Sequence, residues 1–228
     1  MQFSTTDILL TSLFAIGLFQ VIWLSVVLIR KGFAPSVVRF SLLPLLSIWV
    51  LIWPAYTQGL WLMSGFALFL LPIFFAWRSN KAFARHIKLC WHTTPEAQRQ
   101  PTPWLVYLSS LFIAAILFYQ APELGLGVAL SVCLAWPAAE LLDKAGKGLL
   151  LGFALHPNQT LFGHIIFVLS ASLICAWGLQ LYHGVVWYQF FIATLMAGFV
   201  ASAIRGLTPI GWNMPLAFLG MSLTLWVL

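Results

Sequence analysis

Long apolar runs recur along this chain, and they constrain the fold more than any other feature of the sequence. A helix crosses a bilayer with about 20 consecutive apolar residues, and the first run, Ile8–Ile29, meets that length. Only 7% of the residues are charged, whereas soluble domains carry about 25%. This number of charges is too small to cover a water-facing surface. Most of the chain must therefore face lipid.

Eight such runs predict an all-α, polytopic transmembrane helical bundle. The polar stretches between them are short, so we expect residues 1–228 to form a single integral membrane domain. The twelve Trp residues gather near the ends of runs, which predicts an interfacial belt. The expected helices span residues 8–29, 38–53, 60–77, 104–119, 124–142, 161–181, 185–204 and 214–228.

The basic residues predict the orientation, because cytoplasmic loops of membrane proteins are enriched in Lys and Arg. In the eight-helix arrangement all eleven bases fall on one face, whereas the opposite loops around Thr57, Gln120 and His183 hold none. We therefore expect basic loops in the cytoplasm and both ends of the chain outside, in a bacterial inner membrane. The net charge of +6 also suits a nucleotide phosphate, but no motif predicts nucleic acid binding.

Glu140 and Asp143 stand at the expected cytoplasmic end of the fifth helix, three residues apart and therefore on one helix face. Two carboxylates on one face can hold Mg²⁺, which prefers oxygen ligands. Acids at membrane depth are also functional candidates by default. The alternative is that Lys144 and Lys147, each four residues further on, neutralise them.

A glycine-bearing connector follows and ends in the polar turn Pro157–Thr160, just before the sixth helix. Asn158 or Thr160 could cap this helix, and free N–H groups at a helix start favour phosphate binding. A plain capped helix start is the alternative. We expect His164, three residues into the helix, to make an interhelical or interfacial hydrogen bond.

Residues 155–163, Leu-His-Pro-Asn-Gln-Thr-Leu-Phe-Gly, are similar to the Ser-Pro-Asn-Lys-Thr-Leu-Glu-Gly signature of phosphatidate cytidylyltransferases. Their superfamily also holds CTP-dependent dolichol and phytol kinases. The resemblance covers residues 136–215, whereas the helices of residues 1–135 match only generically. Gln159, Phe162 and Trp212 depart from it, because the family has Lys, Glu and Asp at these positions.

The resemblance implies a Mg²⁺-dependent membrane enzyme that uses CTP. It would transfer a cytidylyl group to a phospholipid, or phosphorylate an isoprenoid alcohol, on the cytoplasmic face. The implied catalytic residues are Asp143, Lys144 and Lys147, with Glu140 and Asp143 as metal ligands. The implied nucleotide- and substrate-binding residues are Asn158, Thr160, Gly163, Arg205 and Asn213.

The three departures favour a second interpretation, a non-catalytic membrane subunit or transporter component that has lost the catalytic residues of this fold. Its partner would be another membrane protein or a second copy of the chain. We expect the contacts to run along small residues of the sixth and seventh helices, near Ser170, Ala197 and Gly198, where backbones can approach closely. The sequence leaves open which lipid is used and which interpretation holds.

Overall fold

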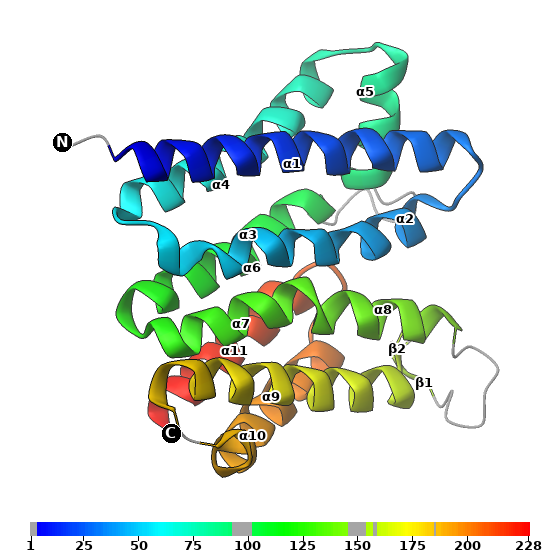
Figure 1. Cartoon of the computed structure of the whole chain (residues 1–228). Coiled ribbons are helices and arrows are strands. Elements are labelled where there is room, and N and C mark those ends of the chain that lie inside the picture. Colours follow the sequence, from blue (N-terminus) through cyan, green and yellow to red (C-terminus); the bar gives the residue numbers. More distant parts are fainter. Residues whose placement is uncertain (1–3, 93–101, 146–153, 157–158, 185) are drawn as a thin grey trace. The chain divides into compact units, whose positions relative to one another are not determined.

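A computed structural model describes residues 4–92, 102–145, 154–156, 159–184 and 186–228. These residues are helical apart from turns and one short strand pair (Figure 1). Among them, seven helical segments are long and apolar enough to cross a membrane. An eighth apolar helix, α11 (Asn213–Val227), has 15 residues, or about 22 Å, against a hydrocarbon core of about 30 Å. The predicted all-α polytopic bundle is confirmed.

Contacts divide the chain into two units, Met1–Leu108 and Ser109–Leu228, with the boundary inside α6 (Pro103–Gln120). In the first unit α1 (Thr5–Arg30) packs against α4 (Gly59–Arg78). The basic segment after α4 forms α5 (Ala82–Ile87) and η3 (Lys88–His92), a helical pair that the apolar runs did not predict.

The second expected helix is interrupted by its prolines. Proline lacks the N–H that an α-helix needs and clashes with the carbonyl four residues earlier, and Pro44 and Pro54 each lie in a 3₁₀ turn. The segment is therefore divided into α2 (Pro35–Leu42), η1 (Leu43–Leu46), α3 (Ser47–Leu51) and η2 (Trp53–Ala55).

Tryptophans form the core of the first unit. Trp49, Trp53, Trp91 and Trp104 are each at most 3% exposed. Trp49 packs edge-on against Trp53, and Trp91 packs edge-on against Trp104. Phe69 lies between the two pairs, against Trp49 and Trp104. The prediction of an interfacial belt is wrong for these four side chains, because they pack on one another.

Asp7, in the first turn of α1, is completely buried. Its carboxylate accepts hydrogen bonds from the backbone N–H and the hydroxyl of Thr57, at 2.9 and 2.6 Å. Bonds to an ionised acceptor are among the stronger hydrogen bonds in proteins. Asp7 therefore fastens the loop before α4 to the start of α1.

In the second unit the fifth expected helix is divided into α7 (Pro122–Cys133) and α8 (Ala135–Ala145). Pro137 explains the break, because its ring conflicts with the carbonyl four residues earlier, that of Cys133, where α7 ends. α7 and α8 together still form one apolar segment long enough to cross a membrane, Pro122–Ala145. α8 carries both acids that the sequence singled out.

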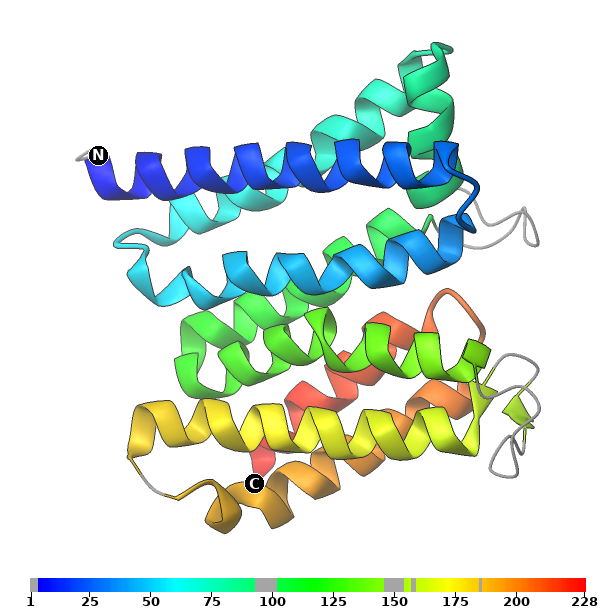
Figure 2. The same ribbon diagram turned by 45° about the vertical axis from the view of Figure 1, so that its right-hand side comes forward.

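Helix α9 (Leu161–His183) lies alongside α7 and α8 and alongside α10 (Trp187–Leu207), as Figures 1 and 2 show. α10 also packs against α11. Before α9, β1 (Ala154–His156) pairs with β2 (Gln159–Thr160) in an antiparallel hairpin. α8, β2 and the start of α9 therefore meet at one end of this unit.

Two of the small residues expected to meet a partner protein are used within the chain. Ala197 and Gly198 are buried. A Cβ at Gly198 would lie 2.7 Å from the Ser172 hydroxyl and 3.2 Å from the Val168 carbonyl oxygen. The predicted contact face is therefore wrong at these positions, because α9 and α10 approach each other there.

The native cysteines suit a labelling test of the predicted orientation. Cys90, Cys133 and Cys175 are free and buried. Burial raises the pKa of the Cys90 thiol to about 12, against the opposing effect of Arg39, so little reactive thiolate forms at neutral pH. Wild type should therefore give a low background with a maleimide.

Single cysteines placed at exposed positions at or near helix ends should report the two sides of the membrane. We expect Lys31→Cys, Arg85→Cys and Lys144→Cys to react with a membrane-impermeant maleimide only from the cytoplasmic side. Ala55→Cys and His183→Cys should react only from outside. Reaction of Arg85→Cys and Ala55→Cys from the same side would contradict the orientation.

Candidate functional site

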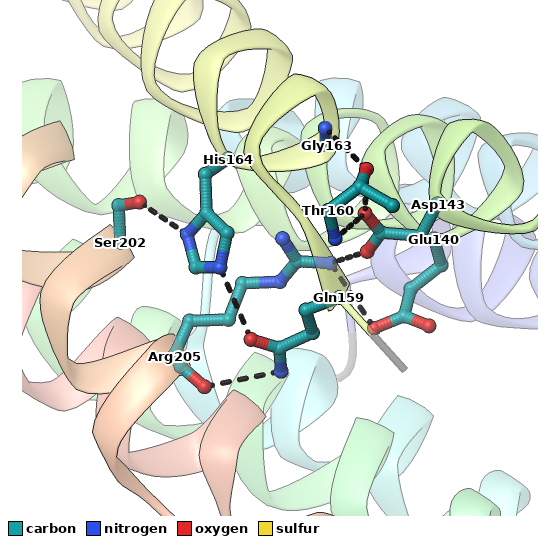
Figure 3. Close-up of polar contacts among 8 residues, drawn as sticks. All are labelled: Glu140, Asp143, Gln159, Thr160, Gly163, His164, Ser202 and Arg205. Atoms are coloured by element: carbon teal, nitrogen blue, oxygen red, sulfur yellow. Dashed lines mark hydrogen bonds and ion pairs between the residues drawn. The ribbon is translucent and has the colours of Figure 1, made fainter. Parts of the chain in front are cut away.

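A buried ion pair joins the ends of α8 and α10 (Figure 3). Asp143 lies in the last turn of α8 and Arg205 in the last turn of α10. The Arg205 Nη2 donates to Oδ2 of Asp143 at 2.5 Å, and the two side chains are 0% and 1% exposed. Two charges this far from water are stabilised by each other, and either one alone would be strongly unfavourable.

The second oxygen of Asp143 binds the start of α9. Oδ1 accepts hydrogen bonds from the backbone N–H and the hydroxyl of Thr160, both at 2.8 Å. The Thr160 hydroxyl in turn accepts from the N–H of Gly163 at 3.1 Å, so Thr160 is the N-cap of α9. The predicted capping role is confirmed for Thr160.

Gly163 permits this contact because it has no side chain. A Cβ built there would overlap Oδ1 of Asp143. The glycine that the sequence singled out as a binding residue therefore lets a carboxylate reach the helix start. Asp143 is thus bonded to two elements at once, β2 through Thr160 and α10 through Arg205.

The guanidinium of Arg205 has further neighbours. Its Nη2 also lies 3.4 Å from Oε1 of Glu140, whose side chain is 20% exposed. The Arg205 Cζ lies 5.1 Å from the ring centre of Trp136 and 5.8 Å from that of Phe167. A desolvated cation over an aromatic ring gains about 2 kcal/mol. Among the described residues, Nε and Nη1 of Arg205 have no hydrogen-bond partner.

A chain of hydrogen bonds leads from the Arg205 carbonyl through β2 and α9 to Ser202, one turn earlier on α10. The Gln159 amide nitrogen donates to the Arg205 carbonyl oxygen at 3.1 Å. The Gln159 amide oxygen lies 3.1 Å from Nε2 of His164, and Nδ1 of His164 lies 2.7 Å from the Ser202 hydroxyl. The expected interhelical hydrogen bond of His164 is confirmed.

The structure brings five of the predicted site residues together, but not all of them. Lys144 is exposed at the end of α8, where its charge acts on Glu140, and Asn213 is buried at the start of α11. Lys147 and Asn158 lie outside the described residues. The five that meet are Glu140, Asp143, Thr160, Gly163 and Arg205.

The two acids do not fit a metal ion in this arrangement. A divalent cation held by Glu140 and Asp143 would lie between their carboxylates, and the Arg205 guanidinium binds both of them there. In the described part of the chain, no three His, Cys, Asp or Glu side chains are grouped so that they could hold a metal. The Mg²⁺ site therefore stays a prediction that this geometry does not favour.

Sequence reasoning missed four contributors to the cluster. Gln159 was noticed only as a replacement for Lys, yet it joins β2 to α9 and α10. Ser202 lies three residues before Arg205 on the same helix, and this spacing could have revealed it. Trp136 and Phe167 have the spacing of ordinary core residues, and no local pattern separates them from such residues.

Comparison with known proteins found no match. No protein-family model, curated protein or solved structure matches the chain.

The contact between Gly163 and Asp143 can be tested by adding one methyl group. Gly163→Ala should lower the thermal midpoint in detergent, because the new Cβ would push the carboxylate away from Thr160. The control is Gly17→Ala in α1, where a Cβ meets nothing within 4 Å. It should stabilise by up to about 1 kcal/mol through helix propensity. Equal midpoints for the two variants would contradict the described packing.

The ion pair can be tested by a double-mutant cycle. Asp143→Asn should destabilise by about 3–5 kcal/mol, because the buried Arg205 then keeps only the longer contact with Glu140. Arg205→Met should be comparably destabilising, since it leaves a buried carboxylate. The double variant should be more stable than either single variant, because the amide oxygen of the introduced asparagine can still accept a hydrogen bond from Thr160.

Glu140→Gln is the matched control for this cycle. The contact between Glu140 and Arg205 is longer, at 3.4 Å, and Glu140 is partly exposed. Glu140→Gln should therefore lower the free energy of unfolding by at most about 1 kcal/mol. Thermal unfolding of all four variants, measured by size-exclusion chromatography after heating, would give the order of their stabilities. Additive losses in the double variant would show that Asp143 and Arg205 do not form the described pair.

Proposed function

We propose that this protein is a non-catalytic membrane subunit in which the Asp143–Arg205 pair is a permanent internal clamp. The observation that supports this is the position of the Arg205 guanidinium, bonded to Asp143 at 2.5 Å and to Glu140 at 3.4 Å. The acids that would bind a metal in a CTP-dependent enzyme are thus balanced by a cation of the chain itself.

The state of the neighbouring polar groups supports the same proposal. Both oxygens of Asp143 already accept hydrogen bonds, and the Thr160 hydroxyl and N–H are used in the same contact. Phosphoryl chemistry relies on charged groups positioned for the substrate. Gln159, where the resembling family has Lys, is a buried neutral amide bonded to His164 and to the Arg205 carbonyl. At position 159 the positive charge that such an enzyme needs is therefore absent, and at Asp143 the negative charge is neutralised by Arg205.

A CTP-dependent lipid enzyme is the second candidate, and one observation favours it. Nε and Nη1 of the buried Arg205 have no hydrogen-bond partner among the described residues, and arginine binds phosphate through paired N–H groups. In this alternative a nucleotide phosphate would bind Arg205 and compete with Asp143. Glu140, which is 20% exposed, would be the acid nearest the incoming substrate.

Nucleotide binding in lipid nanodiscs separates the two candidates. We expect wild type to bind CTP, with or without Mg²⁺, no more tightly than a Kd of about 1 mM, or roughly −4 kcal/mol. With radiolabelled CTP and either a phosphatidate or a long-chain isoprenol, we expect no labelled lipid product above the level of heat-denatured protein.

Glu140→Gln makes the test specific, because this change should leave the fold intact. Turnover by wild type that falls by roughly 10²–10³ in Glu140→Gln would establish a catalytic carboxylate and overturn the proposal. Activity that falls only in Asp143→Asn would carry less weight, since that variant is expected to lose stability. The thermal midpoint of each variant is therefore measured in the same nanodiscs.

A further inference from the structure

An apolar groove runs between α9 and α10 and has a volume of about 690 Å³. This is within the size range of small-molecule sites in proteins, roughly 300–1,000 Å³. Leu161 and Leu169 on α9, and Leu195 and Leu207 on α10, mark its extent along the two helices. Two polar side chains also line it, His164 and Ser202, and none of its described lining residues is charged.

The position of the groove identifies hydrocarbon as its surroundings. Both helices are long and apolar enough to span a membrane, and Leu161, Ile165 and Phe199 on the groove walls are exposed. The groove extends about 12 Å along α9, from residue 161 to residue 169, and about 18 Å along α10, from residue 195 to residue 207. One leaflet of a bilayer core is about 15 Å deep. The groove therefore matches one lipid chain in one leaflet, and it is too short to take the full length of a membrane-spanning partner helix.

The polar end of the groove has a defined hydrogen-bond direction. The Gln159 amide nitrogen donates to the Arg205 carbonyl, so its oxygen accepts, and Nε2 of His164 must be the donor to it. The His164 ring is buried and lies near the Arg205 cation, so the imidazole is neutral and its Nδ1 is an acceptor. The Ser202 hydroxyl therefore donates to Nδ1 and keeps its lone pairs for a further donor.

We propose that this groove binds a single-chain lipid whose head is a hydroxyl group. The chain lies between α9 and α10, and the hydroxyl donates its hydrogen to Oγ of Ser202. The site needs no nucleotide and no catalysis, so it goes beyond the proposed function. A carboxylate or phosphate head is disfavoured, because it would bring another acceptor against a lone pair with no cation among the described lining residues.

Photo-crosslinking in phosphatidylcholine nanodiscs tests the groove. The probe is hexadecan-1-ol with a diazirine in its chain, compared with hexadecanoate and a phosphatidate bearing the same group. We expect the alcohol to label residues 161–169 and 195–207, and unlabelled hexadecan-1-ol to compete. The two anionic probes should label these segments at least fivefold less, since a hydrogen bond to a neutral acceptor contributes about 1 kcal/mol.

Three variants make the test specific. Ala203→Phe should abolish labelling, because Ala203 is exposed and lines the groove. Ile192→Phe, on the same helix, 72% exposed and away from the groove, should leave labelling unchanged. Ser202→Ala should reduce labelling by the alcohol roughly two- to tenfold and reduce its advantage over hexadecanoate. Thermal midpoints check that each variant folds.

Two results would overturn the proposal. One is equal labelling of the groove segments by the alcohol and the anionic probes in wild type, which would mean that the hydroxyl is not recognised. The other is labelling of Ala203→Phe at the wild-type level, or labelling that unlabelled hexadecan-1-ol does not reduce. Either of these would mean that the chain does not occupy this groove.

Discussion

The bond between Arg205 and Asp143 determines how the second unit is arranged at its polar end. Neither charge reaches water, so each needs the other in place. Asp143 is also the acceptor for the Thr160 N-cap, which ties the start of α9 to the end of α8. α10 joins through Arg205 itself. Three helix ends therefore share one carboxylate, and moving any one of them would leave a buried charge or a buried N–H without a partner.

The aromatic rings around Arg205 explain how this cation is held away from solvent. Trp136 and Phe167 come from α8 and α9, and they pack against each other with ring centres 5.7 Å apart. Each ring also faces the guanidinium. The helix break that Pro137 causes places Trp136 near the start of α8. The helix break at Pro137, the two aromatic rings and the ion pair with Asp143 together fix the position of the Arg205 side chain.

The helices were predictable from sequence because the length of an apolar run is a direct physical requirement of the bilayer. The breaks at Pro44, Pro54 and Pro137 follow from the same kind of local rule. Arg205 was not predictable as a partner in this way. Local spacing pointed to Lys147 as the partner of Asp143, whereas its carboxylate bonds Arg205, 62 residues away. No periodicity in a single sequence reports such a contact.

Buried tryptophans and Asp7 were missed for a related reason. A Trp near the end of an apolar run suits an interfacial belt and a helical core equally well, and only packing decides between them, as it does for Trp49 and Trp104. The importance of Asp7 depends on Thr57, which lies 50 residues further along the chain. The sequence identifies the charged residues whose burial at membrane depth is unfavourable. Their partners are set by the tertiary structure.

The direction of the hydrogen-bond chain connects the clamp to the groove. The Arg205 carbonyl can only accept, and this fixes the orientation of the Gln159 amide. That orientation fixes the donor nitrogen of His164, which in turn makes Ser202 a donor to the ring and an acceptor toward the groove. A lysine at position 159 would have only donors. It could not accept the hydrogen bond from Nε2 of His164 that the Gln159 amide oxygen accepts. The neutral Gln159 is therefore consistent with a site that recognises a neutral hydroxyl rather than a phosphate.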